Sequence, residues 1–252
     1  MTNAVSFRGI TKRFPGVLAL EDVSFDVAAG EIHALCGENG AGKSTLGKIL
    51  AGIHTADAGE VRLFGQPLTS ARPEAALAAG VGMVHQELVF CDNLSVAENL
   101  CLRALPASGP FLSKPAMYRQ AEELLSVIDA SIDVRRVVGD LTIGQQQILQ
   151  IAAAVGHGAR VIVFDEPTSS LSQHEAEKLY ELIDKLRARG VTGIYVSHRM
   201  EEIFRLCDTV TVLRDGRHVA TQPASALETG KIVELMIGRK LAEYFPPEID
   251  GG

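Results

Sequence analysis

The chain has 252 residues, of which 46% are hydrophobic and 22% charged, and a net charge of −7 at neutral pH. This composition is ordinary for a globular protein, and the longest apolar runs, such as 161–164, have the length of strands rather than of membrane spans. The acidic balance argues against a nucleic-acid partner held by a general electrostatic field. Four scattered cysteines without metal-binding spacing favour reduced thiols in the cytosol.

Apolar runs of strand length alternate with helical patterns along the chain. The runs cover 5–7, 32–36, 61–64, 81–85, 161–165, 193–197 and 209–213. The last run continues through Asp215 and Gly216, which form a hairpin signal. The clearest helix, 172–190, begins with a Ser172–Glu175 capping box and carries leucine and isoleucine on one face. This alternation predicts an α/β fold with a largely parallel sheet flanked by helices.

The middle of the chain, about 87–158, lacks strong strands. Its patterns predict helices, one of them opening with a capping box at Ser95, and an exposed loop at 106–110. We therefore expect a helical subdomain inserted into an α/β domain that covers 1–240. Prolines and glycines gather in 241–252, which we interpret as a linker or a cut end.

Residues 37–45 read GENGAGKST and fit the pattern G-x-x-x-x-G-K-[ST] of a phosphate-binding loop. A strand-like run precedes them and a helical pattern follows, which is the context this motif needs. In such a loop, backbone N–H groups cradle phosphate oxygens and Lys43 reaches the β- and γ-phosphates. The Ser44 hydroxyl would complete the shell of a Mg²⁺ ion. The alternative is a glycine-rich turn that matches the pattern by chance.

Two acids, Asp165 and Glu166, end an apolar strand. A strand end that meets solvent explains one acid, but a phosphate loop upstream favours a functional pair. Asp165 would hold Mg²⁺, usually through water, and Glu166 could polarise a water molecule for attack on the γ-phosphate.

Three further features are modest in isolation. The stretch LTIGQ (141–145) fits a capping box from Thr142 to Gln145 in front of an apolar helix. Gln86 and His198 each follow an apolar strand, and a lone histidine there is more often a surface or capping residue than a catalyst. Taken singly, these features leave structural roles open.

The order of the features changes their interpretation. Phosphate loop, strand-end glutamine, LTIGQ, Asp-Glu strand and strand-end histidine follow one another as in ATP-binding cassette (ABC) ATPases, which the sequence resembles over roughly 5–240. The resemblance implies a P-loop NTPase core with a mostly parallel sheet, an antiparallel β subdomain and an inserted helical subdomain. It also implies that two cassettes pair head to tail, close on ATP and reopen after hydrolysis.

The resemblance further implies roles for individual residues. Phe14 matches the aromatic residue that stacks on adenine, with a core phenylalanine as the alternative. Gln86 matches a glutamine that contacts Mg²⁺ or the attacking water, and His198 matches a histidine near the γ-phosphate. The implied sets are Lys43, Gln86, Glu166 and His198 for catalysis; Phe14, Gly37, Glu38, Asn39, Gly40, Ala41, Gly42, Lys43, Ser44 and Thr45 for ATP; Ser44, Gln86 and Asp165 for Mg²⁺; and Thr142, Ile143, Gly144 and Gln145 for the signature over the partner cassette's ATP.

Finer resemblance narrows the expected substrate. GMVHQEL, DEPTSSLS and MIGRK (236–240) look like stretches of the ATPase subunit of bacterial ribose, xylose and galactose importers, most of which carry two cassettes in one chain. The chain is then either a single-cassette member that dimerises or the first half of a tandem protein. We expect it to energise uptake of a simple sugar from the cytoplasmic face of the membrane, as a peripheral subunit. Its expected partners are a transmembrane permease, bound beside Gln86 and 87–99, a second cassette and, indirectly, a periplasmic sugar-binding protein.

Other functions explain fewer of these features. A non-transport ABC ATPase of ribosomes or DNA would bring a long insertion, a charged linker or a basic surface. A P-loop kinase or GTPase accounts for the loop alone. A silent regulatory cassette conflicts with the presence of Lys43, Asp165, Glu166 and His198. An ABC ATPase for another solute stays open.

The signature departs from the Leu-Ser-Gly-Gly-Gln usual in the family, with Thr142 for serine and Ile143 for glycine, and Ser172 stands where an aspartate is common. In tandem relatives, the signature of the first cassette serves the weaker ATP site. We therefore expect the double change Thr142→Ser, Ile143→Gly to alter ATP turnover little, which phosphate release under steady-state conditions measures. A large gain in turnover would contradict this tandem interpretation.

Overall fold

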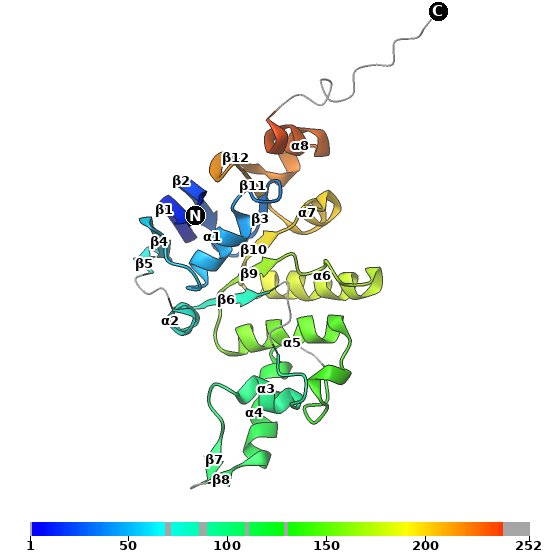
Figure 1. The fold of residues 1–252 in the computed structure, drawn as a ribbon. Coiled ribbons are helices and arrows are strands. Elements are labelled where there is room, and N and C mark those ends of the chain that lie inside the picture. Colours follow the sequence, from blue (N-terminus) through cyan, green and yellow to red (C-terminus); the bar gives the residue numbers. More distant parts are fainter. Residues whose placement is uncertain (1, 69–71, 86–89, 109–110, 129–130, 239–252) are drawn as a thin grey trace, which may run out of the picture.

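The computed structural model describes residues 2–68, 72–85, 90–108, 111–128 and 131–238. It contains two large sheets with helices around them (Figure 1). Within these ranges, no helix combines the length and apolar character that a membrane crossing needs. Gln86, the tail at 241–252 and part of the predicted loop at 106–110 lie outside the described residues.

The larger sheet has six strands in the order β12-β11-β3-β10-β9-β6. The neighbouring pairs from β11 to β6 are all parallel, and β12 runs antiparallel to β11 through the predicted hairpin at Asp215 and Gly216. The expected mostly parallel sheet is confirmed. Its strands are β3 (Ile32–Cys36), β6 (Val81–Val84), β9 (Val161–Asp165), β10 (Thr192–Val196), β11 (Thr209–Arg214) and β12 (Arg217–Pro223).

The smaller sheet is antiparallel, as the resemblance implied, with the order β2-β1-β4-β5. Its strands are β1 (Asn3–Phe14), β2 (Val17–Ala28), β4 (Ala58–Leu63) and β5 (Gln66–Pro67). The run at 5–7 predicted only part of β1, and β2 was not predicted. Alternate residues of β2 are nevertheless buried, so the strand has one core face and one solvent face.

Side chains of the parallel strands enter two separate cores. Ile162 and Phe164 of β9 pack on one face with the helices, whereas Val161 and Val163 pack on the other face with the antiparallel sheet. Helix α1 (Lys43–Leu50) lies between the two sheets. Both faces of the parallel sheet are thus covered, which is why its strands have continuous apolar sequences.

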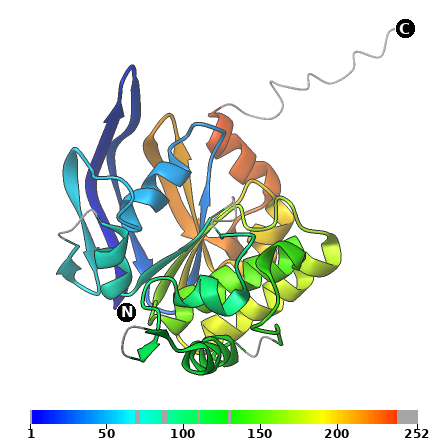
Figure 2. The ribbon, with the colours of Figure 1, turned by 60° about the horizontal axis from the view of Figure 1, so that its bottom comes forward.

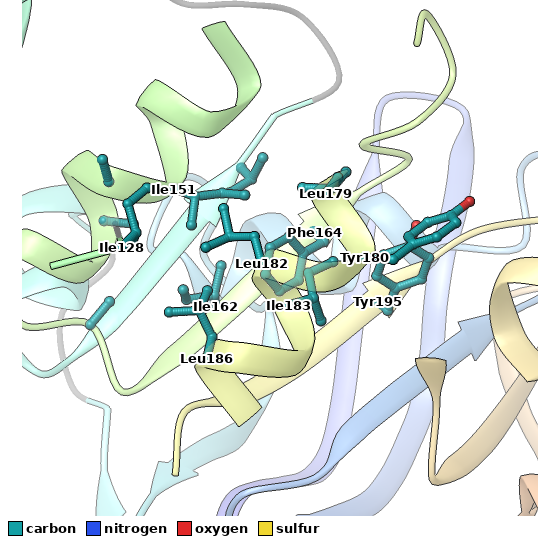
Figure 3. Packing of buried hydrophobic residues seen from close by; sticks show 14 of the residues in the cluster. Ile128, Ile151, Ile162, Phe164, Leu179, Tyr180, Leu182, Ile183, Leu186 and Tyr195 are labelled. Atoms are coloured by element: carbon teal, nitrogen blue, oxygen red, sulfur yellow. The ribbon is translucent and has the colours of Figure 1, made fainter. Parts of the chain in front are cut away.

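The helical face carries α6 (Gln173–Ala188), α7 (Met200–Leu206), the short η2 (Ala224–Ala226) and α8 (Thr229–Ile237) (Figure 1). Helix α6 confirms the prediction for 172–190, including its Ser172–Glu175 capping box. Figure 3 shows its apolar face beside Ile162 and Phe164. The residues of that face are Leu179, Leu182, Ile183 and Leu186.

The middle of the chain is mainly helical, as predicted. It comprises α3 (Val96–Cys101), α4 (Lys114–Ser126), η1 (Val138–Asp140) and α5 (Ile143–Gly156), and a small hairpin of β7 (Ala107–Ser108) and β8 (Phe111–Leu112), preceded in the chain by α2 (Pro73–Ala78). Helices α3 and α4 and the hairpin lie at the end of the molecule away from α8, and Figure 2 brings this end forward. Helix α5 also packs on β6 and α6, so the boundaries of a subdomain stay a prediction.

Glu31 joins the two sheets. Its carboxylate accepts hydrogen bonds from the backbone N–H of Ala28 at the end of β2, from Nδ1 of His33 on β3 and from the hydroxyl of Thr209 on β11, at 2.8, 2.8 and 2.9 Å. Burial alone raises the pKa of Glu31. The hydrogen bond and charge interaction with His33, followed by the hydrogen bonds from Ala28 and Thr209, outweigh burial and lower the pKa. The ionised carboxylate therefore stabilises the fold.

We expect Glu31→Gln to lower the free energy of unfolding at pH 7 by about 1–3 kcal/mol, because three donors lose a charged acceptor. A lowered carboxyl pKa stabilises the protein above the unfolded-state pKa, about 4.3 for glutamate, and this stabilisation is lost as pH falls through the folded-state value. The deficit of the variant should therefore shrink between about pH 5 and pH 3. Urea unfolding across this range measures it.

Glu60→Gln is the control, because Glu60 pairs with Arg62 on the surface and both side chains are nearly half exposed. This substitution should change the free energy of unfolding by less than about 1 kcal/mol. Equal effects of the two substitutions would contradict the role assigned to Glu31.

Candidate functional site

The predicted site residues follow three neighbouring parallel strands. The phosphate loop follows β3, Ser197 and His198 follow β10, and Asp165 ends β9 with Glu166 directly after it. Because β10 lies between β3 and β9, the carboxyl ends of the three strands form one edge of the sheet. This edge is where open parallel sheets bind ligands.

Backbone conformation and close packing require glycine at several positions of the phosphate loop. Gly40 and Gly42 have φ of 85° and 99°, in the region that residues with a Cβ rarely adopt. A Cβ on Gly42 would lie 2.5 Å from Leu20 Cδ2, and one on Gly37 would lie 2.4 Å from the carbonyl oxygen of Leu213. The loop is thus packed between the antiparallel sheet and β11, and its backbone can face a ligand.

The nine loop residues differ in exposure. Glu38, Asn39 and Gly40 are exposed, Ser44 and Thr45 are half-buried, and Gly37, Ala41, Gly42 and Lys43 are buried. Helix α1 therefore begins inside the protein at Lys43, while the tip of the loop at 38–40 faces solvent.

Lys43 is 5% exposed and has its ammonium against the loop backbone. Nζ donates to the carbonyl oxygens of Gly37 and Glu38 at 2.8 and 2.9 Å. Burial lowers the pKa of Lys43, whereas the nearby charges of Glu166 and Asp165 raise it. In both contacts the buried ammonium is bonded to a neutral carbonyl oxygen. It can exchange these carbonyls for an anion, and phosphate oxygens are suitable acceptors.

Ser44 and Asp165 supply paired oxygen atoms. The Ser44 hydroxyl donates to Oδ1 of Asp165 at 2.9 Å, and Asp165 is buried. Hydroxyl and carboxylate oxygens suit Mg²⁺, which usually binds through one or two carboxylates, phosphates and water. In the described part of the chain, no cluster of three or more His, Cys, Asp or Glu residues could hold a metal by itself. The donor set thus fits a Mg²⁺ ion that also needs the phosphates of a ligand.

Glu166 and His198 meet across the strand ends. Nδ1 of His198 lies 3.1 Å from Oε1 of Glu166, and because an ionised carboxylate only accepts, Nδ1 carries the hydrogen in this contact. Glu166 has φ of 46°, a strained conformation for a residue with a side chain, and its N–H donates to the carbonyl of Val196. The Glu166 carboxylate faces His198, whose side chain is 57% exposed.

Phe14 ends β1 and is half-buried, outside the hydrophobic cores. Its ring meets the ring of His54 edge-on, with centroids 5.3 Å apart, and the Lys12 ammonium lies 5.4 Å from the ring. The half-exposed position leaves the adenine-stacking interpretation open. Gln86 lies outside the described residues, one position beyond His85.

The signature residues form a separate group at the start of α5. Thr142 is the N-cap, and Thr142 and Gln145 make the predicted capping box, so the structural interpretation of this stretch is confirmed. Glu175 of α6 reaches the same turn: hydrogen bonds from Ser172, then from Thr142 and from the N–H of Gly144, lower the pKa of its carboxyl. These residues line a cavity of about 710 Å³ between α5 and α6.

The contacts of three residues in the site region were not predicted from the sequence. Glu175 was identified as a cap of α6, but its contact with the signature turn depends on how α5 and α6 pack. Gln150 accepts a hydrogen bond from the N–H of His85 at 2.9 Å; a glutamine on the buried face of an apolar helix was the available clue. Glu202 is 2% exposed next to the exposed Glu201, and no pattern separates the two.

Comparison with known proteins agrees with this geometry. The family model described as ABC transporter matches residues 20–169, more than half of the chain. The chain belongs to the ABC transporter family. It is 47% identical over 246 residues to the arabinose import ATP-binding protein AraG 1 of Burkholderia cenocepacia, which covers 97% of this chain and 49% of that protein.

Further similarities support the same fold for this ABC protein. It is 46% identical over 238 residues to the galactose/methyl galactoside import ATP-binding protein MglA of Shigella boydii, covering 94% of this chain and 47% of that protein. The ADP conformation of MJ1267, an ATP-binding cassette of an ABC transporter, superposes with a TM-score of 0.80 at 25% identity, covering 95% of this chain and 100% of that one. The expected ABC ATPase fold is confirmed, and the chain spans about half the length of the two import proteins.

We expect Gly42→Ala to destabilise the protein more than Gly40→Ala. A Cβ on Gly40 meets no atom within 4 Å, so this substitution costs only the left-handed backbone, about 1–2 kcal/mol. Gly42→Ala adds a collision with Leu20 and with the carbonyl of Ala19, 2.7 Å from the new Cβ, for which about 1–3 kcal/mol more is typical. Urea unfolding without nucleotide measures both, and equal effects would contradict the close packing of the loop.

Proposed function

We propose that the chain binds ATP with Mg²⁺ and hydrolyses it at the shared edge of β3, β10 and β9. The observation that carries the proposal is the convergence of Lys43, the Ser44–Asp165 pair and the Glu166–His198 pair on that edge. Nucleotide phosphates would complete what each group lacks: an anion for the ammonium and further oxygen ligands for a cation.

Binding is assigned to the loop and its surroundings. Backbone N–H groups of residues 37–45 and the N-terminus of α1 bind the phosphates, with Lys43 exchanging its carbonyl contacts for β- and γ-phosphate oxygens. Phe14 stacks on adenine at the end of β1. Ser44 and Asp165, with Gln86, hold Mg²⁺, which supplies charge neutralisation at the phosphates when bound.

Hydrolysis is assigned to the carboxylate and imidazole pair. Glu166 orients a water molecule and accepts its proton as the water oxygen bonds to the γ-phosphorus, while the bond from that phosphorus to the β–γ bridging oxygen breaks and ADP departs. His198 fixes the carboxylate through Nδ1 and lies where it can steady the γ-phosphate. Lys43 stabilises the charge that develops on the transferred group.

A second cassette completes the active unit in this proposal. Thr142, Ile143, Gly144 and Gln145 present the N-terminus of α5 to the ATP of the partner cassette, either in a second copy of this chain or in a covalently linked second half. The position of Thr142 as the N-cap supports this, because its hydroxyl and the positive end of the α5 dipole suit phosphate oxygens.

Transport of a simple sugar is the process we propose that hydrolysis drives. It rests on the import proteins for arabinose and galactose that this chain resembles. A transmembrane permease would bind at the cytoplasmic face, beside Gln86. The residue before it in the chain, His85, lines a cleft of about 260 Å³ with residues that include Asn99, Arg103 and Gln150. A periplasmic binding protein would select the sugar.

We expect Glu166→Gln to keep Mg-ATP binding while lowering kcat by about 10²-fold or more, because the proton acceptor is lost. Phosphate release and nucleotide titration measure the two quantities, with Glu60→Gln as a control that removes an exposed carboxylate. Turnover at the wild-type rate in Glu166→Gln would remove Glu166 from its role.

The mass of Glu166→Gln in solution, with and without Mg-ATP, distinguishes the two modes of pairing. A dimer that forms only with Mg-ATP supports pairing of this chain with itself. ATP binding by a chain that stays monomeric supports a different second cassette.

A further inference from the structure

Glu202, on α7, is a carboxylate that is 2% exposed and surrounded by donors. Its Oε1 accepts from the Thr168 hydroxyl at 2.6 Å and forms an ion pair with Nη1 of Arg199 at 2.9 Å. Its Oε2 accepts from the Ser197 hydroxyl at 2.8 Å and the Tyr195 hydroxyl at 3.0 Å. Each oxygen thus has two polar partners, and the proposed hydrolysis steps use none of them.

The donors come from the segments that carry the proposed catalytic pair. Ser197 and Arg199 flank His198, and Thr168 is separated from Glu166 by Pro167 alone. The Arg199 N–H also donates to the Ser197 hydroxyl at 3.0 Å, which closes the turn around His198. One carboxylate therefore holds both sides of the histidine and the segment that follows the glutamate.

Two tyrosines lie near the Glu202 carboxylate. Tyr195 of β10 and Tyr180 of α6 both belong to the helical-side core (Figure 3). Burial, followed by the charge of Glu202, raises the pKa of Tyr180 to about 12 and raises that of Tyr195 as well. Both phenols therefore stay protonated at neutral pH, and the phenol of Tyr195 donates to Glu202.

We propose that Glu202 is a positioning residue for ATP hydrolysis: it sets the separation of Glu166 and His198 by holding Thr168 on one carboxylate oxygen and Ser197 on the other. This inference rests on the proposed function of Glu166 and His198. The carboxylate is rigid and planar, so the distance between its oxygens fixes how far apart the two segments lie. Glu202 itself, buried behind them, does not touch the nucleotide.

A glutamine at this position tests the inference because it keeps the shape but not the acceptors. The amide has one oxygen, and its NH₂ group would face two donors that need an acceptor. One of the two segments then loses its anchor, and the contact of 3.1 Å between Glu166 and His198 loosens. A misplacement of this kind affects the chemical step more than the binding of ATP.

The experiment compares the 252-residue chain with its Glu202→Gln, Glu201→Gln and Glu166→Gln variants. Steady-state hydrolysis gives kcat and KM for Mg-ATP, titration gives the Kd for Mg-ATP, and thermal unfolding gives Tm. We expect Glu202→Gln to lower kcat by at least about tenfold, with Kd changed by less than about twofold. Glu201→Gln removes the same charge from the exposed side of α7 and should match the wild type.

Two results would overturn the inference. The first is a Glu202→Gln variant with the kcat of Glu201→Gln while Glu166→Gln is inactive, because the catalytic pair would then work without this anchor. The second is a Glu202→Gln variant in which kcat, Kd and Tm all deteriorate together, which marks a purely structural role. Failure of the proposed function looks different: Glu166→Gln would then hydrolyse ATP as fast as the wild type.

A smaller change keeps the test decisive if Glu202→Gln does not fold. Thr168→Val removes one donor and leaves the carboxylate with its others, whereas Thr168→Ser keeps the hydroxyl. We expect a lower kcat in Thr168→Val than in Thr168→Ser at equal Kd for Mg-ATP. Equal kcat values in these two variants would overturn the inference.

Discussion

The parallel register of β3, β10 and β9 is the constraint on which the rest of the site depends. Val196 at the end of β10 pairs with Leu35 on one side and with Asp165 on the other. All three strands consequently end at the same level, and the polar groups that follow them meet there. A shift of one residue in either pairing would turn every side chain to the opposite face of the sheet and exchange the two cores.

Burial on both faces of this sheet gives the site its electrostatic character. Lys43, Asp165 and Glu166 lie close together at the margin of a protein interior, where charges interact more strongly than in water. The Lys43 ammonium is hydrogen-bonded to backbone carbonyls, and the Asp165 carboxylate accepts a hydrogen bond from the Ser44 hydroxyl. A phosphate group with a bound cation would compensate these charges. Keeping the charged groups partly dehydrated without it lowers the stability of the fold.

Local sequence was sufficient where function needs a local backbone shape. The phosphate loop, the capping boxes at Thr142 and Ser172 and the hairpin at Asp215 could all be predicted, since each depends on residues that are close in sequence. The convergence of Asp165 with Ser44 was expected because both were assigned to Mg²⁺ from their motifs, and the common edge of the parallel strands explains it. The local features among these depend on propensity and turn chemistry alone.

Contacts between distant elements could not be predicted. Strand β2 carries acidic residues on its outer face, so its apolar runs are interrupted and only pairing with β1 defines it. The four groups around Glu202 come from β10 and from the loops that follow β9 and β10, and their meeting depends on how α7 packs on the sheet. Burial of a carboxylate is a tertiary property, which the sequence does not contain in any local pattern.

The segment 165–175 connects the two kinds of ATP contact proposed for this chain. It begins at Asp165 and Glu166, passes Thr168, which Glu202 holds, and ends at Glu175, whose carboxylate meets the signature turn. The proposed catalytic carboxylate and the contact with the signature turn thus lie nine residues apart on one segment, and Ser172 and Glu175 close its far end as the capping box of α6.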